Sequence, residues 1–252
     1  MNQTDSLNPA SASVAVIGAG RLGGVLTEAL RAAGFDVHGP FCRDDAVLSV
    51  DIALLCVPDA AIAAVADAVR DRARIVGHVS GATGLDDVDF SMHPLQTFTG
   101  DESPDVFRGI GCAVDAHTDE ALAVATGLAE ALRARAFRVG VAQRAGYHAA
   151  ASTASNLLLT VLDAAEQLAV TAGLPSADAR ALLAPLVRRT VENWADAGAE
   201  ASLTGPIARG DEGTVVRQRA AVADAHPELL ALFDQLCAST RELVGRTQEE
   251  AA

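Results

Sequence analysis

With 252 residues the chain is long enough for one large domain or two smaller ones, and its net charge of -14, from 19 basic and 33 acidic residues, argues against binding along a nucleic acid backbone. The basic residues are all arginine, which excludes catalysis through a lysine Schiff base. The four separated cysteines fit free thiols in a reducing compartment, and we see neither a signal peptide nor a membrane-spanning stretch, so we expect a cytoplasmic protein without a membrane partner.

The first predicted strand, over residues 13–18, runs directly into a glycine-rich turn and a helix over 21–33. Gly18, Gly20 and Gly23 have the spacing of a dinucleotide-binding loop. In such a loop the first glycine makes the tight turn, the second lets the backbone approach a pyrophosphate, and the third lets the helix pack closely on the strand. The start of this helix is therefore a predicted cofactor site.

The chain then alternates between strands and helices. We predict a helix over residues 60–69 and further strands over 35–38, 51–57, 74–80 and 107–114. The strand over 51–57 is almost wholly apolar, as expected in a parallel sheet that is covered on both faces. The helix expected between the second and third strands is nearly absent, so we expect the sheet to lack a full crossover helix on that side.

From residue 143 onward the pattern predicts helices alone, over residues 145–172, 176–197 and 212–225 and from Pro227 onward, with Ser176 as an N-cap. The fold class is therefore α/β, a Rossmann-like doubly wound parallel sheet followed by an all-α domain. The expected divisions are a disordered N-terminus over 1–12, a dinucleotide-binding domain over 13–142 and a helical substrate and dimerisation domain over 143–252.

The choice of cofactor depends on the end of the second strand. NAD-selective sites place a carboxylate there to bind the ribose 2′-hydroxyl, whereas residues 37–40 of this chain read VHGP. Arg43 follows, and its guanidinium can pair with a 2′-phosphate, while Asp44 and Asp45 leave NAD open. We therefore expect NADP, with NAD as the alternative. The cofactor-binding residues predicted from these segments are Gly18, Gly20, Arg21, Leu22, Gly23 and Arg43.

His93 and Gln96 lie in the sequence HPLQTF, on the side of the sheet where parallel strands end and α/β folds bind ligands. Pro94 is expected to stiffen a turn, which presents both side chains to a crevice near Ser80 and Thr83. The alternative is that His93 only caps this turn.

A second polar group follows Tyr147, where His148, Ser152 and Asn156 recur every four residues and so share one face of a helix. Most positions between them are alanine. Because burying an unpaired polar group costs on the order of 1 to 3 kcal/mol, this face must meet water, a substrate or a neighbouring helix.

A third polar group lies in the tight loop over residues 203–211. Arg209 offers a planar guanidinium that suits a carboxylate. Asp211 either orients Arg209 or caps the helix that follows.

Five segments, in this order, carry a resemblance to a known family: GAGRLGG, VPD from Val57, HPLQTF, YHAAASxxSN and LTGPIxRGD. The chain resembles predicted oxidoreductases that join a Rossmann-like NAD(P)-binding domain to a C-terminal helical domain of unknown function. More widely, it is similar to ketopantoate reductase, pyrroline-5-carboxylate reductase and 6-phosphogluconate dehydrogenase. The resemblance implies an active site between the two domains, a homodimer formed through the helical domains, and cofactor contacts at Val57 and Pro58.

The resemblance further implies hydride transfer to a small 2-oxo acid such as ketopantoate, with an imine or a prephenate-like acid as the alternative substrate. His148 stands where ketopantoate reductases have a catalytic lysine, so it is the expected general acid. Ser152 and Asn156 are expected to hold the carbonyl, His93 to border the nicotinamide, and Arg209 to bind the substrate carboxylate. Outside the enzymes, the alternative is a sensor or scaffold that binds NADP without turnover.

Overall fold

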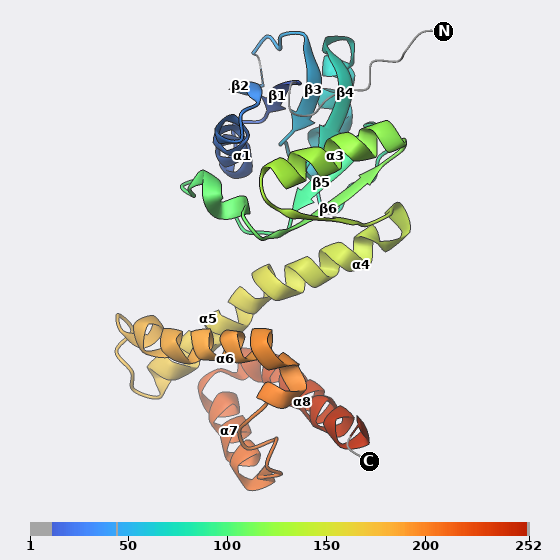
Figure 1. Cartoon of the computed structure of the whole chain (residues 1–252). Helices are drawn as coiled ribbons and strands as arrows, with labels where there is room; N and C mark the ends of the chain where they lie inside the picture. The colour runs from blue at the N-terminus through green and yellow to red at the C-terminus, as the bar shows by residue number, and fades with distance from the viewer. Residues whose placement is uncertain (1–11, 44, 251–252) are drawn as a thin grey trace. The chain divides into compact units, whose positions relative to one another are not determined.

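The computed structural model describes residues 12–43 and 45–250. Residues 1–11, for which the sequence predicts disorder, and Asp44 lie outside the described residues. The chain divides into two compact units between Ser155 and Asn156 (Figure 1).

The first unit contains one seven-stranded sheet within the described residues. Its strands are β1 (Ser13–Ile17), β2 (Asp36–Phe41), β3 (Val50–Leu55), β4 (Ala73–His78), β5 (Phe90–Pro94), β6 (Gly111–Ala116) and β7 (Arg135–Arg138). Their order is β2-β1-β3-β4-β5-β6-β7, and every neighbouring pair is parallel except β5 and β6. The predicted fold class is confirmed, since this mostly parallel sheet is followed by a region of helices alone.

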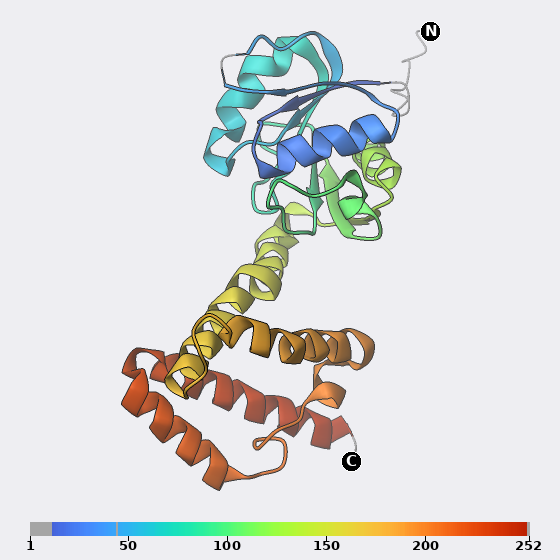
Figure 2. The same cartoon turned by 90° about the vertical axis from the view of Figure 1, so that its left-hand side faces the viewer.

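Helices cover both faces of the sheet (Figure 2). On one face α1 (Arg21–Ala32) and α3 (Asp119–Ala131) share a core with Val16 of β1. On the other face α2 (Ile62–Val69) shares a core with Ile17. Successive residues of a strand point to opposite faces, so the apolar strands predicted from the sequence are buried on both sides.

The sheet also corrects the prediction of a turn at Pro94. Pro94 is the last residue of strand β5, which pairs antiparallel with β6. The amide of Leu95 donates a hydrogen bond to the carbonyl of Gly111 on β6. Because the amides of successive strand residues point in opposite directions, the nitrogen of Pro94 faces β4. Because β4 pairs with β5 only at Phe90 and Ser91, no hydrogen bond is lost when position 94 has no amide hydrogen.

Three other elements of the first unit differ from the prediction or were not foreseen. The strand expected over 107–114 begins only at Gly111, and Phe107 ends a 3₁₀ helix, η4 (Pro104–Phe107). The sequence analysis did not predict α3 or β7. The segment between β2 and β3 contains no helix among its described residues, as expected.

The region of helices begins with α4 (Val141–Ser152), which belongs to the first unit, so the two units divide after the predicted boundary at residue 142. A π-helical turn over Thr153–Leu157 then breaks the α-helical geometry within the predicted helix 145–172. The second unit contains α5 (Leu158–Thr171), α6 (Ala179–Ser202), α7 (Glu212–Ala225), η6 (Pro227–Leu229) and α8 (Leu230–Glu250).

Within the second unit α8 packs against α6 and α7, and α5 contacts the same two helices. The N-cap of α6 is Asp178, rather than Ser176 as predicted, and its side chain makes no capping hydrogen bond. Among the described residues, no helix combines the length and the apolar character that crossing a membrane requires.

Candidate functional site

The glycine loop joins β1 to α1. Gly18 has a φ of +114°, and a Cβ on it would overlap the backbone carbonyl of Cys56 at the end of β3. A Cβ on Gly23 would overlap the carbonyl of Gly18. The packing of the chain itself therefore requires glycine at these two positions. Gly20 differs, because nothing lies within 4 Å of the place where its Cβ would be.

Gly20 is the N-cap residue of α1 and has no side chain to cap the helix. The amides of the first helical turn have no carbonyl partners within the helix, and the first turn contains no acidic residue. Free amides, a positive helix end and open space above Gly20 together suit a phosphate group. These residues fit the pyrophosphate of a dinucleotide.

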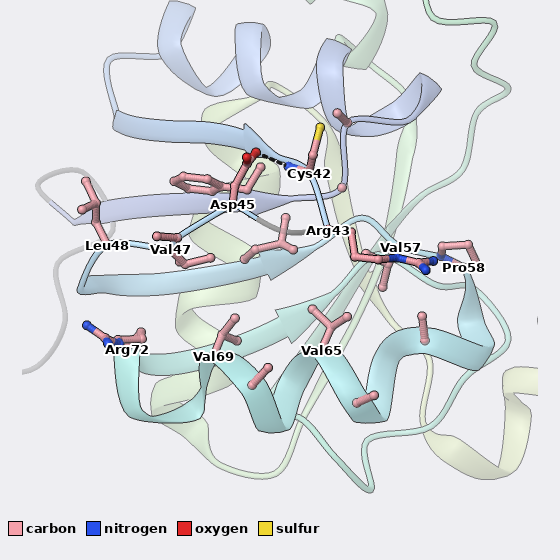
Figure 3. Close-up of a pocket in the computed structure, with 18 of the residues that line it drawn as sticks. Cys42, Arg43, Asp45, Val47, Leu48, Val57, Pro58, Val65, Val69 and Arg72 are labelled. Carbon is pink, nitrogen blue, oxygen red and sulfur yellow. Dashed lines mark hydrogen bonds between the residues drawn. The ribbon is translucent and has the colours of Figure 1, made fainter.

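A cavity of about 1030 Å³ lies beside this loop, and Figure 3 shows the side chains around it. The ends of β1, β2 and β3 border it, together with the segment 42–49 and helix α2, and its lining is mostly apolar. Arg43 lies beside Val57 and Pro58 at one end of the cavity, whereas Arg72 lies at the other (Figure 3). The carboxylate of Asp45 accepts a hydrogen bond of 2.6 Å from the amide of Cys42.

A cluster of polar side chains, which we call the His93 cluster, joins β5 to α4. It consists of His93, Tyr147 and His148. A hydrogen bond of 2.6 Å connects Nδ1 of His93 with the hydroxyl of Tyr147. The ring of His148 lies edge-on to that of His93, with centroids 6.4 Å apart. Phe137 also packs edge-on against the Tyr147 ring, with centroids 5.9 Å apart.

Gly81, just beyond the end of β4, makes room for the cluster. A Cβ on Gly81 would lie 2.9 Å from Nε2 of His93 and 3.0 Å from Cδ2 of His148. Such distances are shorter than van der Waals contact, so any side chain here would displace one of the imidazoles. The two histidines therefore come together over a position where glycine leaves room for both rings.

Arg144 connects α4 to the sheet beneath the cluster. Its side chain is buried and donates to Oγ of Ser91 at 2.7 Å and to the carbonyl of Ser80 at 3.3 Å. The carboxylate of Asp115 on β6 lies 3.9 Å away. Among the described residues, Nε of Arg144 has no hydrogen-bond partner. Arg144 thus contacts the ends of β4 and β5 and faces β6, which fixes α4 against all three strands.

The environment keeps His93 neutral. Burial lowers the pKa of His93 to about 4, and the nearby charges of His148 and Arg144 act in the same direction, while Asp59 opposes them. Burial raises the pKa of the Tyr147 phenol to about 12. At neutral pH the hydrogen bond therefore joins an uncharged imidazole to an uncharged phenol.

His78 is buried close to the cluster but has a structural role. Its Nδ1 accepts from the amide of Ser80 at 3.1 Å, and its Nε2 is 2.8 Å from the carbonyl of Gly84. Burial lowers its pKa as well. Since both ring nitrogens bind the backbone of one turn, His78 shapes the loop that carries Gly81.

The structure brings His93 and His148 together but separates other candidates. Gln96 is exposed, and its side-chain oxygen accepts from the amide of Thr97 at 2.9 Å. Ser152 is the last residue of α4, one turn after His148. Asn156 and Arg209 belong to the second unit, so their part in this site stays a prediction.

Asp211 caps α7, one of the two roles considered for it, because its carboxylate accepts from the amide of Thr214 at 3.0 Å. Sequence analysis missed the contacts of Tyr147, Arg144, Ser91 and Asp115. For Tyr147 a signal existed, since it is the only tyrosine and adjoins His148.

The fold, the glycine loop and the adjoining cavity define a Rossmann-like protein with the architecture of NAD(P)-dependent oxidoreductases. The chain belongs to the family described as "Domain of unknown function (DUF2520)", whose model matches residues 110–240, just over half of its length. A search of curated proteins finds no match.

Solved structures share the whole fold. A candidate NADP oxidoreductase from Bacteroides fragilis has a TM-score of 0.77 at 22% identity and covers 93% of this chain and 100% of its own. Protein TM1727 from Thermotoga maritima has a TM-score of 0.76 at 20% identity, over 93% of this chain and 99% of that one. Pyrroline carboxylate reductase from Plasmodium falciparum, solved with NADP bound, has a TM-score of 0.59 at 10% identity. The match covers 93% of this chain and 99% of that one.

We predict that Arg144→Met lowers the free energy of unfolding by about 3–5 kcal/mol, because it leaves the buried carboxylate of Asp115 without its buried cation. Urea unfolding followed by circular dichroism measures the change. Arg138→Met is the matched control: Arg138 is exposed and contacts the same carboxylate at 3.4 Å, so its loss is expected to cost no more than about 1 kcal/mol. Equal effects of the two substitutions would contradict the role of Arg144.

Proposed function

We propose that the protein is an NADP(H)-dependent oxidoreductase that reduces a small 2-oxo acid. The observation that carries this proposal is Gly20, because the chain's own packing does not require glycine there and a bound phosphate does. The cavity borders the same loop at Gly18, and the His93 cluster lies against Gly81 beyond the end of β4, which supports a dinucleotide bound at the ends of these strands.

The sheet order supports the direction in which the cofactor is bound. β2 lies on one side of β1 and β3 on the other, so the order of the strands reverses at β1, and dinucleotides bind at such a switch point. The cavity between the segment 42–49 and α2 would hold the adenosine half. The amides after Gly20 would hold the pyrophosphate, and the ends of β3 and β4, at Val57 and Gly81, would border the nicotinamide. When bound, the reduced nicotinamide supplies a hydride.

We expect Arg43→Ala to raise the Kd for NADPH about 10- to 100-fold and to leave the Kd for NADH nearly unchanged, since a charge-assisted bond to the 2′-phosphate is lost. Calorimetry with both cofactors measures this. Arg72→Ala, at the other end of the cavity, is the control and should affect neither Kd by more than about threefold. If Arg43→Ala raises the Kd for NADPH and the Kd for NADH equally, Arg43 does not bind the 2′-phosphate.

His148 is proposed as the general acid that protonates the carbonyl oxygen, with Ser152 one turn away on α4 as a hydrogen-bond donor to it. His93 faces the same space beside Gly81. Arg209 of the second unit keeps its predicted role as the ligand of the substrate carboxylate. An imine such as a pyrroline carboxylate is the second candidate substrate, which the likeness to pyrroline carboxylate reductase favours.

The test is NADPH oxidation in a screen of 2-oxo acids and cyclic imines. With the active substrate, His148→Ala is expected to lower kcat about 10²- to 10⁴-fold, and Arg209→Ala is expected mainly to raise KM. His117→Ala, a substitution of an exposed histidine whose Nε2 binds the carbonyl of Leu85, is the control and should leave kcat unchanged. Binding of NADPH without oxidation by any compound would favour the sensor or scaffold, and rates within a few-fold of wild type for both variants would reject these roles.

We further propose a homodimer formed through the second unit. The buried apolar residues of its described part are only Ala164, Ala179, Val215, Val222 and Cys237. Meanwhile Leu182, Leu186 and Trp194 of α6 are more than half exposed, at 59%, 65% and 57%. Exposed apolar side chains of this size are typical of an interface, and a second copy of the chain would cover them.

Light scattering is therefore expected to give twice the chain mass of 25.8 kDa at micromolar concentration. Leu186→Glu combined with Trp194→Glu should give the monomer, because charges in an apolar interface are costly. Arg188→Glu, also exposed on α6 but on another face, is the control and should leave the dimer intact. A monomeric wild type would contradict the dimer.

A further inference from the structure

The hydrogen bond between His93 and Tyr147 determines which nitrogen of His93 bears the proton. A neutral imidazole has one N–H and one lone pair, and the partner of one nitrogen fixes the state of the other. Among the described residues, the hydroxyl of Tyr147 has only Nδ1 of His93 as a hydrogen-bond partner. A half-buried phenol needs an acceptor for its proton, and an imidazole lone pair is a better acceptor than a phenol oxygen.

Tyr147 O–H therefore donates to Nδ1, and the remaining proton of His93 is on Nε2. Nε2 is the nitrogen that lies against Gly81, at the end of β4. It has no hydrogen-bond partner among the described residues of the protein, so its N–H remains available to a ligand. The neighbouring imidazole of His148 also lies against Gly81.

We propose that Tyr147 holds His93 in the Nε2–H tautomer, so that His93 acts as a neutral hydrogen-bond donor to the substrate carbonyl oxygen while His148 supplies the proton. This inference rests on the proposed function. When bound, the reduced nicotinamide would supply the hydride for the new C–H bond. The π electron pair of the carbonyl would then move to oxygen, and this oxygen would take the proton of His148. His93 keeps its proton throughout, and water returns the proton to His148.

The charges around His93 support this division of roles. His148 and Arg144 face it from α4, His78 from β4 and Asp59 from the 3₁₀ turn before α2. Burial, reinforced by the charges of His148 and Arg144 and opposed by Asp59, lowers the pKa of His93 to about 4. A protonated His148 therefore disfavours a second proton on His93. A neutral His93 beside His148 is therefore suited to polarise the carbonyl without giving up a proton.

The tautomer can be measured without any substrate. Long-range ¹H–¹⁵N correlation spectra of the ¹⁵N-labelled protein, with the His93 signals assigned from His93→Gln, are expected to show the Nε2–H form between about pH 5.5 and 8. Tyr147→Phe should give a mixture of tautomers, and His117→Gln, at a remote exposed position, should leave the signals of His93 unchanged. A Nδ1–H tautomer, or protonation of His93 near the ordinary pKa of about 6.5, would overturn the inference.

Kinetics then tests the role of the Nε2 proton. His93→Gln keeps a neutral N–H donor and is expected to retain kcat within about 10-fold of wild type, whereas His93→Leu should lose about 10²- to 10³-fold. Tyr147→Phe should lower kcat about 10-fold. Equal losses of kcat in His93→Gln and His93→Leu would overturn the role of His93 as a hydrogen-bond donor. If no compound oxidises NADPH, the proposed function fails, while the spectra still decide the tautomer.

Discussion

The buried guanidinium of Arg144 is the contact on which the candidate site depends. Removing an arginine from water costs several kcal/mol, and this cost is offset only if hydrogen bonds and an opposite charge surround it. Here Ser91, the carbonyl of Ser80 and the carboxylate of Asp115 provide them. These groups come from the segment after β4, from β5 and from β6, so they surround the guanidinium together only when α4 lies in one position. The same charge disfavours protonation of His93, which means that one side chain both positions the cluster and sets its electrostatics.

The glycine loop, the fold class and the helices of the second half could be predicted from the sequence because each depends on local patterns. The glycine spacing lies within a single βα turn, although the contact that requires Gly18 is with Cys56 at the end of β3, and apolar periodicity marks the helices. His93 and His148 were recognised as candidates by residue type and setting alone. Their meeting over Gly81 could not be predicted, since it depends on the packing of α4 across the ends of β4 and β5.

The antiparallel pairing of β5 with β6 explains most of what sequence reasoning missed. Pro94 led the sequence analysis to predict a turn. A strand can contain proline here because β4 does not pair with β5 at position 94. Once β5 is a strand, His93 and Ser91 lie two residues apart on the same face, and Asp115 lies directly opposite Ser91 on β6. The acceptors of Arg144 are therefore created by strand pairing, which no local pattern around Arg144 reveals.

The positions of the glycines connect the two halves of the proposed site. Gly18 and Gly23 are explained by the chain, whereas Gly20 leaves open space at the start of α1 and Gly81 makes room for two imidazoles. β3 is the one strand between β1 and β4 in the sheet order. At about 4.8 Å per strand, the ends of β1 and β4 are roughly 10 Å apart, a distance that half of a dinucleotide can span. A dinucleotide whose phosphate is held at Gly20 would thus place its nicotinamide half within reach of the imidazoles over Gly81. Gly20 and Gly81 are therefore best explained together.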